Sequence, residues 1–317
     1  MKGRILLAGV AGFLGCHLAR RFLGEGYEVV GIDNFVTGTE ANAAWLAGDP
    51  AFSLVSHDIC RPLSVGDGFD GVLHLASPAS PPDFLRLPIE TLEAGSLGTR
   101  NLLELALRNG ARFLLASTSE VYGDPQLHPQ PEAYSGNVNP VGPRSAYDEA
   151  KRFSEALSMA YHRAHGLSVG IARIFNTYGP RMRPDDGRVV SNFLVQALRG
   201  DPLTIYGDGS QTRSFCYVDD LVEGLLRLFE SVHSGVVNLG NPAEYTISEV
   251  ATTVLQLVGS SSTLDYGSLP EDDPKVRCPD ITRARSLFGW EPAVSLPEGL
   301  ARTLPYFRDA LRDRGGG

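Results

Sequence analysis

The sequence predicts an α/β protein with a doubly wound parallel sheet and a smaller C-terminal lobe. Apolar strand-like runs alternate with helical patterns along the first half of the chain, which is the order of a parallel sheet covered by helices on both faces. The first of these runs ends in glycines spaced three residues apart. After residue 178 the alternation loosens and prolines and glycines become frequent, which indicates a second lobe.

The alternation assigns the elements of the sheet in turn. Helices are expected at 13–24, 88–109 and 145–165, and a late strand at 236–240 is expected to return to the same sheet. The earlier strands are expected at 4–9, 28–33, 52–58, 71–77, 112–118 and 168–174.

The glycine turn indicates a nucleotide. Gly9, Gly12 and Gly15 follow an apolar strand and precede a helical pattern, so that bare backbone N–H groups can approach a pyrophosphate. Asp33 ends the next strand about twenty residues later, where a carboxylate accepts hydrogen bonds from an adenosine ribose and repels a 2′-phosphate. A turn or helix-cap aspartate is the alternative. The pattern favours a Rossmann-like domain that binds NAD rather than NADP.

Two domains follow from these elements. The NAD-binding Rossmann domain is predicted to comprise residues 1–178 plus 213–240, and the substrate-binding lobe 179–212 plus 241–317. Because ligands bind at the carboxyl ends of parallel strands, the lobe is expected to cover that edge of the sheet.

Composition excludes several classes of partner. The formal net charge is −9 and no dense Lys/Arg cluster occurs, which argues against nucleic acid. The four cysteines lie far apart without a CxxC pair, so free thiols in a reducing compartment are expected. No apolar run reaches the roughly eighteen residues that cross a bilayer, and the N-terminal run leads into the glycine turn rather than an export signal. We expect a cytoplasmic protein without a membrane contact, and the seven histidines suggest no metal site.

Tyr147 and Lys151 are the candidate catalytic pair. Side chains four residues apart share one face of a helix. A phenol with a pKa of about 10 acts as a base near neutral pH only if its pKa falls by roughly three units, about 4 kcal/mol. A neighbouring ammonium and a cationic nicotinamide both favour the phenolate. A surface pair on an amphipathic helix is the alternative, which the nucleotide motif disfavours.

Together the glycine turn, Asp33 and the Tyr147/Lys151 pair resemble the extended short-chain dehydrogenase/reductase family over nearly the whole chain. The resemblance implies a tightly held NAD and a nucleotide-sugar substrate. It also implies a homodimer in which the helices at 88–109 and 145–165 pack against their copies, although their apolar stripes equally fit burial within one chain.

Ser119 and Glu120 indicate which reactions of a nucleotide sugar are disfavoured. Sugar-nucleotide 4,6-dehydratases of this family carry Asp-Glu at this place, since a carboxylic acid must protonate the leaving hydroxyl and a serine is far too weak an acid. Dehydration is therefore disfavoured. A 4-epimerase is also disfavoured, because inverting a hydroxyl group needs no carboxylate at the position of Glu120. The alternative for Glu120 is a charge at the start of a helix, with no part in the reaction.

Longer segments resemble the subfamily that decarboxylates UDP-glucuronate, namely 75–82, 173–182, 186–193, 209–213 and 272–281. This resemblance implies conversion of UDP-glucuronate to UDP-xylose through a transient 4-ketone, with internal return of the hydride. The alternatives are an oxidative decarboxylase that releases the 4-keto pentose and NADH, a 4,6-dehydratase, and an NAD-sensing protein without catalysis.

The resemblance also implies roles for individual residues. The catalytic set is Tyr147 as base, Lys151, Thr118 as a second donor to the C4 oxygen, Glu120 to position a water or the sugar, and Arg277 to hold the C6 carboxylate. A surface ion pair is the alternative for Arg277. The expected cofactor contacts are Gly9, Gly12, Phe13, Leu14, Asp33, Asn34, Phe35, Thr37, Gly38, Asp58, Ile59, Leu75, Ala76, Ser77, Tyr147, Lys151, Thr177 and Arg188. The expected substrate contacts are Pro81, Glu120, Asn176, Arg188, Asn192, Tyr206, Arg213 and Arg277.

Overall fold

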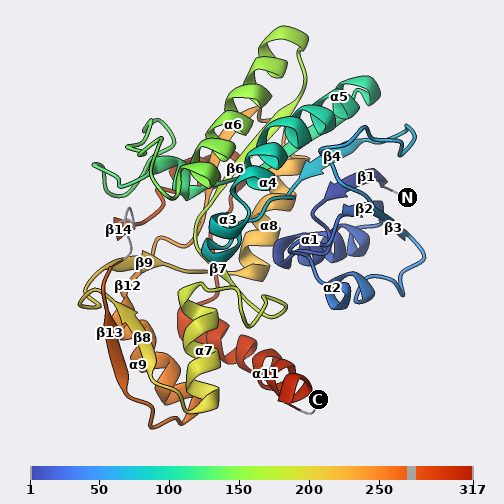
Figure 1. The fold of residues 1–317 in the computed structure, drawn as a ribbon. Helices are drawn as coiled ribbons and strands as arrows, with labels where there is room; N and C mark the ends of the chain where they lie inside the picture. The colour runs from blue at the N-terminus through green and yellow to red at the C-terminus, as the bar shows by residue number, and fades with distance from the viewer. Residues whose placement is uncertain (1, 270–275, 316–317) are drawn as a thin grey trace.

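A seven-stranded parallel sheet forms the centre of the molecule (Figure 1). The computed structural model describes residues 2–269 and 276–315. The sheet has the order β11-β6-β5-β4-β1-β2-β3, and its direction of winding reverses between β1 and β4, the place where ligands bind to such sheets. The predicted fold class is confirmed. The strands are β1 (Gly3–Ala8), β2 (Tyr27–Asp33), β3 (Phe52–Ser56), β4 (Gly71–His74), β5 (Arg112–Thr118), β6 (Val169–Ile174) and β11 (Gly235–Leu239).

Alternate side chains of each strand enter two different cores, as the two-residue period of a strand requires. In β1, Ile5 and Leu7 belong to the core that includes side chains of α1 (Phe13–Gly24) and α8 (Val218–Glu230). Leu6 and Ala8 belong to the opposite core, with α5 (Thr99–Asn109). Helix α6 (Ser145–His165) packs against α5 and β5.

The strand at 236–240 does return to the sheet, since β11 pairs with β6, and α1 and α6 have the predicted bounds. The single helix expected at 88–109 is wrong in detail. The segment consists of α4 (Pro88–Glu93), a π-helical turn (Ala94–Gly98) and α5. A Cβ on Gly95 would lie 2.7 Å from the Cβ of Ala150. The π-helical turn therefore packs closely on α6 at the place where the helix type changes.

The C-terminal part of the chain builds a second group of elements beside the sheet (Figure 1). Strand β8 pairs with β13, and β9 lies between β12 and β14. No helix within residues 2–269 and 276–315 is long and apolar enough to cross a membrane. The elements are α7 (Val189–Arg199), β8 (Leu203–Tyr206), β9 (Thr212–Ser214), β12 (Glu244–Thr246), α9 (Ile247–Val258), β13 (Leu264–Gly267), β14 (Val276–Arg277), α10 (Thr282–Phe288) and α11 (Leu296–Gly315).

Short elements lie in the connections between these helices and strands. Strand β7 pairs with β10, parallel to it. These elements are α2 (Glu40–Ala44), α3 (Pro81–Arg86), the 3₁₀ turn η2 (Ser119–Tyr122), β7 (Thr177–Tyr178) and β10 (Cys216–Tyr217).

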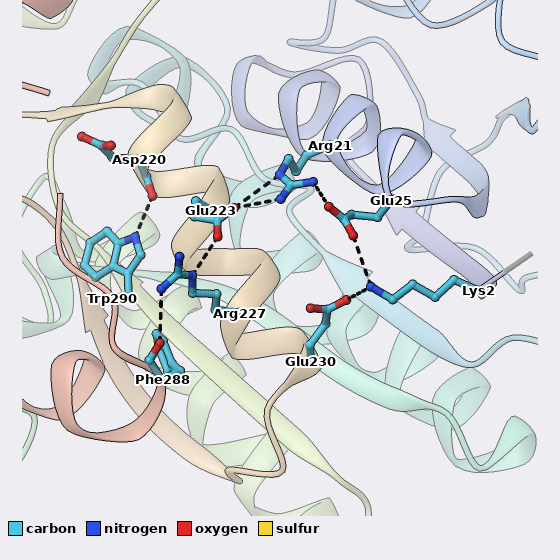
Figure 2. A network of polar contacts seen from close by, with 9 residues as sticks. All are labelled: Lys2, Arg21, Glu25, Asp220, Glu223, Arg227, Glu230, Phe288 and Trp290. Carbon is cyan, nitrogen blue, oxygen red and sulfur yellow. Dashed lines mark hydrogen bonds and ion pairs between the residues drawn. The ribbon is translucent and has the colours of Figure 1, made fainter. Parts of the chain in front are cut away.

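Helix α8 is tied to its neighbours by a chain of polar contacts (Figure 2). Glu223 accepts hydrogen bonds from Arg21 of α1 at 3.0 Å and from Arg227 at 2.7 Å. Near its end, Glu230 accepts from Lys2. On the other side, the indole of Trp290 donates to the carbonyl of Asp220 at 2.9 Å. Exposed ion pairs of this kind stabilise by at most about 1 kcal/mol each, so they fix the position of α8 more than they stabilise the fold.

The glycine turn allows a matched test of packing in α1. A Cβ on Gly15 would lie 1.9 Å from the carbonyl oxygen of Gly9, whereas a Cβ on Gly24 in the same helix meets nothing within 4 Å. Gly15→Ala must displace the turn, and we expect it to lower the free energy of unfolding by roughly 1–3 kcal/mol and to weaken NAD binding.

Gly24→Ala is the control, with a neutral effect or a gain of up to about 1 kcal/mol from helix propensity. Urea unfolding measures both variants, and equal stability of the two would contradict the packing argument.

Candidate active site

A cavity of about 800 Å³ opens at the carboxyl ends of β1, β4, β5 and β6. All five residues of the predicted catalytic set line it: Thr118, Glu120, Tyr147, Lys151 and Arg277. The predicted substrate contacts line it as well: Pro81, Asn176, Arg188, Asn192, Tyr206 and Arg213, together with Glu120 and Arg277. The segments therefore converge from distant parts of the chain on one site.

The glycine turn forms one wall of this cavity, and its shape fits a dinucleotide. Gly9 has φ +85°, and a Cβ there would lie 2.6 Å from the backbone nitrogen of Ala76. Helix α1 begins after Gly12 with no side-chain cap and no acidic residue in its first turn. Its first N–H groups therefore remain available to an anion such as a pyrophosphate. Other predicted cofactor contacts on the lining are Phe13, Leu14, Thr37, Leu75, Ser77 and Thr177, besides Tyr147, Lys151 and Arg188.

Asp33 joins the turn to the following loop. Its carboxylate accepts hydrogen bonds from the N–H groups of Ala11 and Phe35, both at 2.9 Å. Burial raises its pKa, although these N–H groups act in the other direction. A Cβ on Gly38 would lie 2.8 Å from Oδ1 of Asp33, so the loop passes close to this carboxylate.

Seven predicted cofactor contacts do not line the cavity: Asp33, Asn34, Phe35, Gly38, Asp58, Ile59 and Ala76. The side chain of Ile59 is buried in the core against Gly98, which leaves only its backbone for a ligand. The cofactor roles of these residues stay predictions.

Tyr147 and Lys151 project from one face of α6, as their spacing predicts. The Tyr147 ring is buried and stacks on Phe84, with ring centres 5.1 Å apart and planes at 8°. The Lys151 ammonium donates to the carbonyl of Ala116 on β5 at 2.9 Å and lies 5.9 Å from the centre of the Tyr147 ring. Phe84 is a contact that the sequence analysis missed, because it precedes Tyr147 by more than sixty residues.

Glu120 lies between two arginines. Its Oε2 accepts from Arg144 at 2.7 Å and from Arg277 at 3.3 Å. Arg277 is 1% exposed and also donates to the carbonyl of Ser119 at 3.0 Å, so it is not a surface ion pair. Its Nε is buried without a hydrogen-bond partner in the described part of the chain. Arg277 belongs to the segment 272–281, on which the resemblance to the decarboxylating subfamily partly rests. Residues 272–275 of that segment lie outside the described residues.

Comparison with known proteins places this site in a family. The sequence model of the NAD dependent epimerase/dehydratase family matches residues 5–240. The chain belongs to this family. The NAD dependence of the family confirms the predicted cofactor, and its relatives confirm the resemblance on which the sequence analysis drew.

Three members of the family illustrate the similarity. UDP-glucuronic acid decarboxylase 1 of Xenopus tropicalis is 53% identical over 310 residues, which are 98% of this chain and 73% of the relative. UDP-glucose 4-epimerase of Thermotoga maritima, solved with UDP-glucose, matches with a TM-score of 0.90 at 30% identity over 97% of this chain and 99% of that chain. UDP-glucuronic acid 4-epimerase of Bacillus cereus, solved with UDP-glucuronic acid and NAD, matches with a TM-score of 0.85 at 31% identity over 96% and 99%.

In this epimerase/dehydratase family member, burial acts on the pKa of Tyr147 against the neighbouring positive charges. Burial raises the pKa of the phenol to about 12, and the nearby Arg188 and a hydrogen bond from Thr118 only partly oppose it. Lys151 directs its ammonium to Ala116, and burial lowers its own pKa to about 8. The protein alone therefore does not lower the phenol pKa, because the cost of burying a phenolate exceeds the gain from its neighbours. A cationic nicotinamide in the cavity acts in the required direction.

Glu120 on the cavity lining and Asp148 next to Tyr147 have opposite protonation behaviour. Burial tends to raise the pKa of Glu120, but Arg277 and Arg144 outweigh it and lower that pKa to about 2. Burial and then the negative Glu120 raise the pKa of Asp148 to about 7. Oδ1 of Asp148 has no hydrogen-bond partner among the described residues. Sequence reasoning missed both Arg144 and Asp148, although both flank Tyr147.

The raised pKa of Asp148 predicts a pH-dependent gain from Asp148→Asn. The native state holds this proton more tightly than the unfolded chain, so the group's stabilising contribution is complete below pH 3.8 and is lost as pH rises through 7. Asparagine keeps the shape without the charge. We expect the variant to raise the free energy of unfolding at pH 7.5 but hardly at pH 4, with an upper bound on the order of 4 kcal/mol.

Urea unfolding at the two pH values checks this prediction. Glu149→Gln, which removes an exposed charge next to Asp148 on the same helix, is the control and should change stability little at either pH. An equal effect of Asp148→Asn at both pH values would show that its charge is not the cause.

Proposed function

We propose that this chain converts UDP-glucuronate to UDP-xylose and carbon dioxide through a transient 4-ketone that is reduced again within the same turnover. The observation that carries the proposal is the buried Arg277 on the cavity lining, whose Nε has no hydrogen-bond partner among the described residues. A guanidinium pairs with a carboxylate in a planar fork, which suits a substrate with a carboxylate at C6. The 53% identity to a UDP-glucuronic acid decarboxylase supports the same substrate.

Tyr147 and Thr118 would carry out the proton transfer and the charge stabilisation that this reaction needs. NAD, when bound, supplies reversible oxidation at C4 of the sugar. Tyr147 takes the proton of the C4 hydroxyl, and the C4 ketone then lies β to the C6 carboxylate. When the bond from C5 to C6 breaks, its electron pair moves onto the C4 oxygen as an enolate, which Tyr147 and Thr118 stabilise as donors. One such donor is worth about 3 kcal/mol of barrier. C5 then takes up a proton in place of the lost carboxylate, and the proton held by Tyr147 goes back to the C4 oxygen when the ketone is reduced again.

The state of Glu120 argues against dehydration. With a pKa of about 2 it is ionised at neutral pH, and it therefore has no proton for a leaving hydroxyl. The hydroxyl of Ser119 is too weak an acid for that step. We assign Glu120 to hold Arg277 in place and to orient a water or a sugar hydroxyl.

The division of the chain follows the same proposal. Residues 1–178 plus 213–240 bind NAD, and residues 179–212 plus 241–317 bind the nucleotide sugar. Arg188 and Arg213, which line the cavity, suit its phosphates, and the predicted contacts Asn176, Asn192 and Tyr206 lie on the same lining. The four free cysteines support the cytoplasm as the compartment, which cell fractionation would test.

Product analysis tests the proposal directly. Purified protein with NAD and UDP-glucuronate should release carbon dioxide and form UDP-xylose, identified by NMR, with no net rise in NADH absorbance. One NADH for each carbon dioxide, with a 4-keto pentose as product, would instead establish the oxidative decarboxylase. Tyr147→Phe is the control variant, since it should keep NAD affinity and lose turnover by orders of magnitude.

We also propose that the protein is a homodimer. Exposed apolar side chains occur on neighbouring helical segments, with Ile89 and Leu92 on α4, Leu97 in the π-helical turn and Phe153 on α6 exposed by 40–62%. Apolar surface of this kind marks an interaction site. Light scattering should give the mass of two chains, and Phe153→Glu should give that of one. Val232→Glu, at an exposed site outside these helices, should remain dimeric, and a monomeric wild type would overturn the proposal.

A further inference from the structure

A cluster of three metal-ligating side chains lies outside the lining of the cavity. His128, Glu244 and Cys278 place a ring nitrogen, a carboxylate oxygen and a sulfur within 4.8 Å of one another. They come from the loop after η2, from β12 and from the residue that follows β14. We propose that these three residues bind a thiophilic divalent cation such as Zn²⁺. The sequence analysis suggested no metal site, because these residues are far apart in the chain.

The rest of the protein holds the three ligands in position. The hydroxyl of Thr212 donates to Oε1 of Glu244 at 2.8 Å, which leaves Oε2 against the imidazole of His128 at 2.9 Å. Gln130 fixes the backbone of Cys278 twice, because its N–H donates to the Cys278 carbonyl and its side-chain oxygen accepts from the Cys278 N–H, both at 2.9 Å. The hydrogen bonds from Thr212 and Gln130 therefore orient the three ligands, as outer hydrogen bonds usually do around metal ions in proteins.

The donor set selects the type of cation. Imidazole, carboxylate and thiolate together suit Zn²⁺, whereas Mg²⁺ and Ca²⁺ prefer oxygen ligands only. Bond lengths of about 2.0–2.3 Å place the ligand atoms of a tetrahedral zinc roughly 3.3–3.8 Å apart. The 2.9 Å contact between His128 and Glu244 has to open slightly for both side chains to bind the ion. The thiol loses its proton to solvent when the ion binds, and water takes the fourth position through the exposed side of the cluster, where His128 lies.

The position of the cluster gives the ion a structural task. Glu244 and Cys278 belong to or adjoin the β12-β9-β14 sheet, which also carries Arg213 and Arg277. His128 belongs to the loop that follows Glu120 in the chain. A cation shared by all three would fasten this sheet to that loop without entering the cavity. The inference does not depend on the reaction that the cavity performs.

Cobalt provides the test, since Co²⁺ replaces Zn²⁺ and gives a near-ultraviolet charge-transfer band when a thiolate binds it. The full-length protein, stripped with a chelator, should develop this band with one equivalent of Co²⁺. Cys278→Ser should abolish the band, and His128→Ala and Glu244→Gln should weaken Co²⁺ binding at least tenfold. Cys60→Ser, which changes another free thiol, is the matched control and should leave the band unchanged.

A second readout is thermal stability with Zn²⁺ alone. Zn²⁺ in excess of its dissociation constant should raise the Tm of the wild type by several degrees and leave that of His128→Ala unchanged. Absence of the cobalt band, its survival in Cys278→Ser, or an equal rise of Tm in His128→Ala would each overturn the site.

Discussion

The active site depends on how α6 is docked on the sheet. The buried carboxylate of Glu155 accepts two hydrogen bonds from Arg173 of β6, at 2.7 and 2.9 Å, and one from Ser117 of β5 at 2.5 Å. Removing one partner of such a pair leaves an uncompensated buried charge, which is far costlier than the pair's modest net contribution to stability. The helix therefore has one favourable position on the sheet. Since Lys151 and Tyr147 lie one and two turns before Glu155, that position also sets where the phenol and the ammonium stand.

Two carboxylates, Glu120 and Asp148, together act on the charge of Arg144 and Arg277. Glu120 is ionised because Arg144 and Arg277 donate to it directly. Asp148 has no such donor at Oδ1 within residues 2–269 and 276–315, and burial raises its pKa to about 7. If both were ionised, they would compete for the same two guanidinium groups. Because Asp148 holds its proton in part of the molecules near pH 7, it repels an anionic substrate less than a fully ionised carboxylate would.

The parts of the fold that were predictable from sequence are those with local causes. The two-residue and 3.6-residue periods locate the strands, α1 and α6, and the glycine turn identifies the cradle for a dinucleotide. The break in the helix at 88–109 was missed because it accompanies contact between Gly95 and Ala150, which lie far apart in the chain. Phe84 and Arg144 were missed for the same reason, since each acts through a contact with another segment. The neighbours of Tyr147 were predictable from the helical spacing, whereas the depth of its burial, which raises the pKa of the phenol, was not.

The small β12-β9-β14 sheet adds a constraint that the seven-stranded sheet does not contain. Parallel pairing sets Arg213 opposite Arg277, and side chains at paired positions lie on the same face of a sheet. Two neighbouring guanidinium groups that are both buried repel each other, and Glu120, which Arg213 and Arg277 both hold in its ionised form, compensates part of that repulsion. A ligand that carries a diphosphate and a carboxylate would compensate more of it. Since a neutral sugar of the same shape carries no such charge, this pair of arginines favours an anionic ligand.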